Sequence, residues 1–148
     1  MAKTDVNVAA PKKAALESRR KPTGRLPRPV AGAVKAALDK KAADVVVLDL
    51  RKAGGFTDYF VICTGNNARQ IQAIADGVEH ALRSDLGERP AVVEGVEKSE
   101  WVLLDYFNFV VHVFSPDCRA FYGLERLWGN AVRHDFSNAE PQSGVARG

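Results

Sequence analysis

A carboxylate and an imidazole lie near each other in the most apolar part of the chain. Asp105 and His112 fall within two apolar runs, residues 101–106 and 109–114. If these runs form a hairpin that turns at residues 107–108, the two side chains are diagonal neighbours on one face of a sheet. A carboxylate that orients an imidazole can serve as a general base, but no serine or cysteine stands at a strand-to-helix turn as a nucleophile. We therefore interpret the two residues as a hydrogen-bonded pair that fixes the register of the hairpin.

Two other patterns would suit phosphate or metal chemistry, and neither has the required spacing. Gly54-Gly55 and the following Thr57-Asp58 fit neither a P-loop nor a dinucleotide-binding loop, so they are interpreted as a connection between strands. Asp44, Asp49 and Asp58 could surround Mg²⁺, but they contain no Asp-x-Asp pair. No catalytic residue, metal ligand or cofactor is therefore expected. The alternative from another functional class is a nucleotidyltransferase-like enzyme that uses Asp49 or Asp58 with Mg²⁺ and a nucleotide.

The segment 119–128 carries an unusual density of large apolar side chains. Phe121, Leu124, Leu127 and Trp128 form one stripe at helical spacing, with Tyr122, Glu125 and Arg126 beside it. Such a stripe is typical of a hydrophobic core. Only 8% of the residues in the chain are aromatic, however, and this segment holds more large side chains than one short helix needs. A second interpretation is that Tyr122 and Trp128 face a protein partner, because aromatic residues often anchor interfaces.

The spacing of apolar residues predicts helices and strands in the order α-β-β-α-β-β-β-α. The predicted helices are residues 30–42, 67–87 and 115–129, and the predicted strands are 44–50, 59–63, 91–94, 101–106 and 109–114. Asn67 with Gln70, and Ser115 before a proline, are predicted N-caps, and Gly87 and Gly129 are predicted C-caps. In the predicted hairpin Leu103 lies opposite His112 and Trp101 opposite Phe114. Apolar helices that cover such a sheet predict an α/β or α+β fold with a mixed five-stranded sheet.

Charge divides the chain into a basic tail and a mildly acidic domain. Residues 1–29 carry a net charge of +6 and four prolines, whereas the rest of the 148-residue chain carries −3. We predict a disordered tail over 1–29, one domain over 30–137 and a flexible C-terminal tail over 138–148. The basic tail is interpreted as a solvated extension, a weak contact for RNA phosphates, or a targeting signal. Two isolated cysteines and the lack of a long apolar run favour the cytoplasm and no membrane span.

Several spaced segments together resemble the ribosomal silencing factor family, also called the RsfS or Iojap family. They follow the family's order and cover about residues 33–130, nearly the whole predicted domain. The matching segments are Asp49-Leu50, Thr57 to Asn66, Arg69 to Ala75, Glu94-Gly95, Trp101 to Asp105, Val110 to Phe114 and Arg119 to Trp128. Family members often carry Gly-Asp where this chain has Phe107-Asn108, so contacts at the hairpin tip stay open.

The resemblance implies a factor that is not an enzyme. Such factors bind the large ribosomal subunit through its fourteenth protein, block joining to the small subunit, and lower translation when nutrients are scarce. Organellar relatives assist large-subunit assembly, which stays an alternative here, as does a homodimer of the free protein. The family's fold is similar to that of nucleotidyltransferases without their paired catalytic acids. By position, the resemblance implies that the partner is bound by Trp101, Asp105, His112, Tyr122, Leu124, Glu125 and Trp128.

Overall fold

A single mixed sheet with helices on both faces forms the fold of this chain. The computed structural model describes residues 26–136. Its elements are α2 (Arg28–Asp39), β1 (Ala43–Asp49), β2 (Tyr59–Thr64), α3 (Ala68–Leu86), β3 (Val92–Glu94), β4 (Trp101–Asp105), β5 (Phe109–Phe114), α4 (Pro116–Tyr122), α5 (Leu124–Leu127) and β6 (Val132–Asp135). None of the helices among these residues is long and apolar enough to cross a membrane.

The sheet has six strands in the order β3-β4-β5-β2-β1-β6. Strands β2 and β5 pair in parallel, and each of the other neighbouring pairs is antiparallel. The predicted mixed sheet is therefore confirmed, but the predicted count of five strands is wrong. The missing strand is β6, which is only four residues long and alternates between buried and exposed positions. Such a short alternating segment gives little signal in a sequence.

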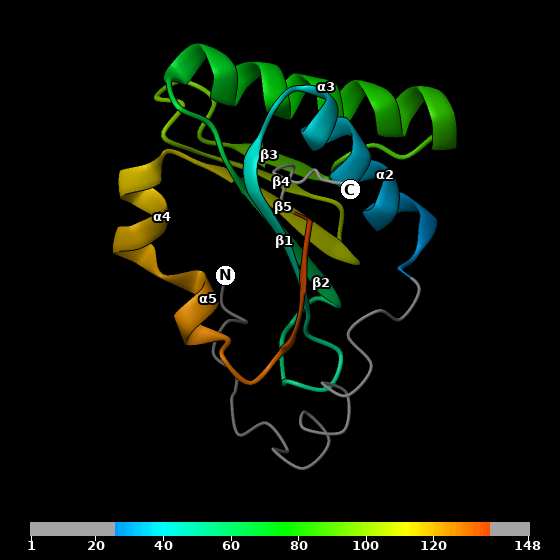
Figure 1. Ribbon diagram of the computed structural model, residues 1–148. Coiled ribbons are helices and arrows are strands. Elements are labelled where there is room, and N and C mark those ends of the chain that lie inside the picture. The colour runs from blue at the N-terminus through cyan, green and yellow to red at the C-terminus, as the bar shows by residue number, and fades with distance from the viewer. Residues whose placement is uncertain (1–25, 137–148) are drawn as a thin grey trace, which may run out of the picture.

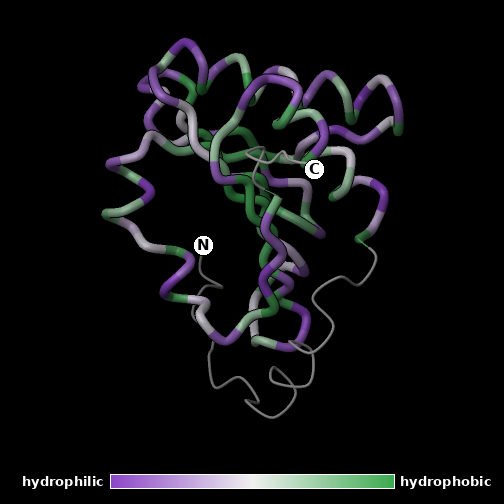
Figure 2. Tube along the Cα trace, viewed as in Figure 1, coloured by the Kyte–Doolittle hydropathy of each residue, from purple (hydrophilic) through white to green (hydrophobic). Residues whose placement is uncertain are grey.

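The two faces of the sheet carry different helices. Helices α2 and α3 pack side by side on one face, and α4 and α5 lie on the other (Figure 1). The central strands form the most apolar part of the trace, while the outer turns of α3 are hydrophilic (Figure 2). Because it is covered on both sides, β1 has a continuous apolar run from Val45 to Leu48, each at most 2% exposed. The sequence predicted this burial, and the structure confirms it.

The helix ends follow the local signals in the sequence. The side-chain oxygen of Asn67 accepts a hydrogen bond from the backbone N–H of Gln70 at 2.8 Å, and Gly87 ends α3 in the left-handed conformation. Gln70 in turn accepts from the N–H of Asn66, one residue before the cap. The hydroxyl of Ser115 accepts from the N–H of Cys118 at 3.1 Å and so begins α4. The predicted caps at both helix starts are confirmed.

The last predicted helix is two short helices. Gly123 has φ of +55° and ends α4, and α5 begins at the next residue. Its left-handed backbone stops one helix and turns the chain before the second begins. The prediction of one continuous helix capped by Gly129 is therefore wrong. The apolar stripe across 121–128 concealed the break because its spacing continues through the glycine.

The hairpin formed by β4 and β5 has the predicted register. Trp101 lies opposite Phe114, and Leu103 lies opposite His112. The turn contains Phe107 at φ of +78°, an uncommon conformation for a bulky residue. Two side chains hold this turn: a carboxylate oxygen of Asp105 accepts from the N–H of Phe107, and the hydroxyl of Thr57 donates to its carbonyl.

Candidate functional site

Three of the residues expected to bind a partner lie together on the face that carries α4. Trp101 opens β4, and its indole N–H donates a hydrogen bond of 3.0 Å to Nδ1 of His112 on β5. The Trp101 ring also packs against the ring of Tyr122 on α4, with 4.7 Å between centroids. His112 is buried, whereas Tyr122 is 50% exposed. The cluster therefore connects a buried imidazole to an exposed phenol through one indole.

The predicted hydrogen bond between Asp105 and His112 is wrong. Both Trp101 and Asp105 are diagonal neighbours of His112 in the hairpin register. The indole of Trp101 occupies Nδ1 of the imidazole, and Asp105 instead accepts from the turn N–H of Phe107 at 2.8 Å. A carboxylate beside a tight turn is close to the unpaired N–H groups of that turn. Asp105 therefore bonds to the nearby backbone and not to His112 on the other strand.

The environment of His112 keeps its ring neutral. Burial lowers the pKa of His112 to about 3. Because Nδ1 accepts from the indole, the proton of the neutral ring lies on Nε2, which has no hydrogen-bond partner among residues 26–136. The ring of Phe60 lies edge-on to the imidazole, with 4.5 Å between the two ring centroids. With its pKa this low and its Nδ1 already accepting from the indole, this imidazole is poorly suited to act as a general base.

Helix α5 places two further expected residues against the same face of the sheet. Leu124 and Trp128 are half-buried and pack on the core cluster that contains Leu48 and Phe60. The Trp128 ring meets that of Phe60 edge-on at 6.3 Å between centroids. These side chains thus serve in the core and keep part of their surface accessible. Phe121 and Leu127 of the same stripe are 77% and 69% exposed, so the core interpretation is wrong for them.

Glu125 is held by two arginines. Its carboxylate accepts two hydrogen bonds of 2.9 Å from the guanidinium of Arg119, and Arg133 on β6 lies 3.2 Å away. The bonds from Arg119 lower the pKa of Glu125 below its usual value. Sequence reasoning did not single out Arg119. In one continuous helix, side chains six positions apart point in directions roughly 120° apart, so only the break at Gly123 brings this pair together.

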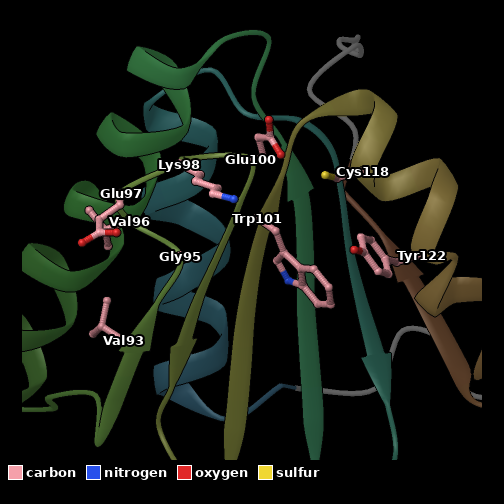
Figure 3. Close-up of a pocket in the computed structure, with 9 residues that line it drawn as sticks. All are labelled: Val93, Gly95, Val96, Glu97, Lys98, Glu100, Trp101, Cys118 and Tyr122. Atoms are coloured by element: carbon pink, nitrogen blue, oxygen red, sulfur yellow. The ribbon is translucent and has the colours of Figure 1, made fainter.

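A groove of about 630 Å³ lies beside the Trp101–Tyr122 contact (Figure 3). Trp101 and Tyr122 lie side by side on one side of it, and the side chain of Lys98 extends towards Trp101 (Figure 3). We call it the aromatic groove, and its lining residues are Val93, Gly95, Val96, Glu97, Lys98, Glu100, Trp101, Cys118 and Tyr122.

Exposed apolar side chains continue around the aromatic groove. Val93 and Val96 are more than 40% exposed, and Phe121, which meets the Tyr122 ring edge-on, is 77% exposed. Part of the lining of the aromatic groove is charged, namely Glu97, Lys98 and Glu100. An apolar centre with a charged border is the usual composition of a protein-docking surface.

The remaining candidate residues do not join this cluster. Asp105 lies at the opposite end of β4 from Trp101. Asp49 is paired with Arg51 at 2.8 Å, and within residues 26–136 no group of three or more His, Cys, Asp or Glu side chains converges on one point. The Gly54-Gly55 segment connects β1 to β2, as predicted, and the side chain of Ala53 beside it is buried.

Comparison with known proteins gives a consistent result. The family model described as "Ribosomal silencing factor during starvation" matches residues 24–147. The chain is 44% identical over 99 residues to ribosomal silencing factor RsfS of Halalkalibacterium halodurans, covering 67% of this chain and 84% of that protein. It is 41% identical over 101 residues to the chloroplastic protein Iojap of Zea mays, covering 66% of this chain and 42% of that longer protein.

A solved structure supports the same assignment. The crystal structure of a Chromobacterium violaceum protein superposes with a TM-score of 0.67 at 31% identity. The superposition covers 84% of this chain and 98% of that one. The family model spans most of the chain, and the sequence and structure comparisons agree with it. This chain therefore belongs to the ribosomal silencing factor family.

Proposed function

We propose that this chain is a cytoplasmic factor that binds the large ribosomal subunit through its fourteenth protein. Once bound, it prevents the small subunit from joining and so represses translation when nutrients are limited. The observation that carries the proposal is the aromatic groove, where the half-exposed ring of Tyr122 rests on Trp101. Membership of a family whose proteins are named ribosomal silencing factors supports the choice of partner.

The docking surface comprises the seven residues expected from the sequence, in different roles. Tyr122 offers the partner an exposed ring, while Trp101, Leu124 and Trp128 contribute the accessible parts of half-buried side chains. His112 acts from beneath the surface by holding Trp101. Glu125 lies on α5, and Asp105, at the far end of β4 from Trp101, would contact the partner at the margin of this surface.

Steric exclusion is sufficient for this function. A specific complex needs roughly 800 Å² of surface on each partner. A few aromatic anchors within such an area carry most of the binding free energy. The factor therefore needs no catalytic step, because a domain that occupies the joining surface of one subunit excludes the other.

Replacing Tyr122 by alanine tests this docking surface. Tyr122→Ala should weaken binding to purified large subunits by about 2 kcal/mol or more if the ring is an anchor. Sedimentation of the protein with separated large and small subunits measures this loss. Half of the Tyr122 surface is exposed and α4 buries no residue fully, so the fold should survive the change.

A matched control removes another exposed ring. His80 lies on the outer side of α3, in the layer on the opposite face of the sheet. His80→Ala should bind large subunits as the wild type does. Equal binding by Tyr122→Ala would reject the aromatic groove as the docking surface. Accumulation of immature large subunits in a deletion strain, without an excess of active polysomes during starvation, would favour an assembly factor instead.

A further inference from the structure

Arg119 on α4 makes an unusually complete set of hydrogen bonds. Nε and Nη2 donate to the two carboxylate oxygens of Glu125, each at 2.9 Å. Nη1 donates to the carbonyl of Asp44 on β1 and to the hydroxyl of Thr64 at the end of β2, each at 2.8 Å. The side chain of Arg119 therefore joins α4 to α5 and to two neighbouring strands. Charge-assisted bonds with this forked geometry are among the strongest polar contacts in proteins.

An irregularity in β1 supplies one of these acceptors. Between Ala43 and Val46 the strand advances three residues while its partner β2 advances two, which is a β-bulge. Asp44 lies inside the bulge at φ of +49°. A bulge leaves one residue unpaired in the ladder, and here the carbonyl of Asp44 accepts from Arg119 instead. The backbone distortion is therefore compensated by the guanidinium.

Helices α4 and α5 depend on few other contacts. Neither contains a fully buried residue. Their apolar attachment to the sheet consists of half-buried side chains, among them Cys118, Leu124 and Trp128. The side chain of Arg119, by contrast, is only 12% exposed and has acceptors on both sides. A weakly buried pair of helices is expected to lose its position when its most extensive polar attachment is removed.

We propose that Arg119 is the positioning residue of the docking surface, holding α4 and α5 where Tyr122 rests against Trp101. This proposal rests on the function proposed above, because it concerns how that surface is presented. Arg119 acts through Tyr122 and Glu125, and Glu125 has a structural role in addition to any contact with the partner. Arg133 on β6 forms an ion pair with the Glu125 carboxylate and so links α5 to this edge strand.

The two cysteines of the chain are natural probes for this proposal. Cys118 lies on α4 in the lining of the aromatic groove, and its exposure reports on local opening of the helix. Cys63 on β2 is fully buried, and burial raises its pKa to about 12. Its thiol reacts only when the whole domain unfolds, because thiolate formation and access are both blocked. Labelling with N-ethylmaleimide, followed by peptide mass spectrometry, measures the two rates separately.

Arg119→Met should raise the labelling rate of Cys118 by about tenfold and leave that of Cys63 unchanged, because loss of charge-assisted bonds opens α4 locally. Arg119→Lys keeps the charge but cannot span the same acceptors, so it should also raise the Cys118 rate. Val78→Ala is the matched control, since Val78 is fully buried on α3 across the sheet. This control should raise the Cys63 rate without a selective change at Cys118.

Binding to purified large subunits completes the test. Arg119→Met should bind about tenfold more weakly at a temperature where Cys63 stays protected, and Val78→Ala should bind normally. An unchanged Cys118 rate in Arg119→Met, or normal binding despite a raised rate, would overturn the positioning role. If the wild-type protein does not bind large subunits, the proposed function fails and the docking role of Arg119 with it. The labelling rates would still show whether Arg119 holds α4.

Discussion

The contact between Trp101 and His112 places a hydrogen bond inside an otherwise apolar layer. The imidazole has a buried Nε2–H without an acceptor among residues 26–136, which carries a desolvation cost. In return, the indole is fixed in one orientation next to Tyr122. A hydrogen bond can fix a ring in one orientation because it is directional, whereas apolar packing alone allows the ring several similar orientations.

This burial predicts a pH dependence of stability. The folded-state pKa of His112 is about 3, below the ordinary value of 6.5. The unfolded chain therefore binds a proton that the folded protein does not, and the stability falls as the pH is lowered from about 6.5 towards 3. His112 should make the free energy of unfolding about 2 kcal/mol smaller at pH 5 than at pH 7. Urea titration at the two pH values measures the difference.

A substitution separates His112 from the other titrating groups. His112→Asn keeps an acceptor near the position of Nδ1 but does not titrate. Burial also lowers the pKa of His134, so part of the pH dependence remains in the variant. Glu125, whose pKa is lowered, loses its contribution only below its ordinary value of 4.5. If His112→Asn showed the same pH dependence of stability as the wild type, folding would not lower the pKa of His112.

At the level of elements, the turn of the β4–β5 hairpin carries backbone strain. Phe107 adopts φ of +78° with 79% of its surface exposed, so its ring gains little burial in return. Phe107→Gly should raise the free energy of unfolding by about 1 kcal/mol, because glycine has no Cβ to disfavour this conformation. Thermal or urea unfolding measures the change.

Alanine at the same position is the matched control for the turn. Phe107→Ala removes the same ring but retains Cβ, so it should have little effect on stability. If the two variants are equally stable, the positive φ of residue 107 is not a source of strain. The hydrogen bonds that Phe107 makes with the side chains of Asp105 and Thr57 would then be sufficient to hold the turn.

Elements with a continuous local signal were predictable from the sequence. The hairpin register and the caps at Asn67 and Ser115 are set by nearby residues, and the structure confirms them. The break at Gly123 and the strand β6 were not predictable in this way. Both depend on contacts made elsewhere in the chain: Gly123 turns α5 towards Arg119, and β6 exists because β1 offers an edge.

The candidate site shows the same division between local and distant information. The sequence predicted Trp101, His112 and Tyr122 as partner-binding residues, since their types and positions match a family pattern. Their mutual arrangement, with the indole bonded to the imidazole in place of Asp105, needed the three-dimensional structure. Arg119 escaped notice because its three acceptor residues are far away in the sequence or lie beyond a helix break.

For the whole molecule, the separation of charge predicts a salt-dependent contribution to ribosome binding. Most of the predicted basic tail falls outside the described residues, which begin at Leu26, and Leu26 packs against the core. A deletion should therefore end at residue 25. If the tail contacts ribosomal RNA, deleting residues 1–25 should weaken binding mainly at low salt. It should also reduce the slope of log K against log salt by about 1 or more.

The other end of the chain offers the control for this deletion. Residues 137–148 contain one glutamate and one arginine, so their removal leaves the net charge unchanged. Deleting residues 137–148 should leave the slope of log K against log salt unchanged. Equal slopes for the full chain and for the chain without residues 1–25 would rule out an electrostatic contact with RNA. Binding titrations at several salt concentrations distinguish the two results.

The pairing of β6 with β1 has a consequence for biosynthesis. Val47 on the first strand lies opposite His134 on the last, so the sheet is completed only when nearly the whole domain has left the ribosome. Until then β1 is an open edge with a continuous run of valines, a template for pairing with other chains. A message cut short before codon 132 would therefore yield a product prone to aggregate, and one in which α5 lacks its anchor at Arg133.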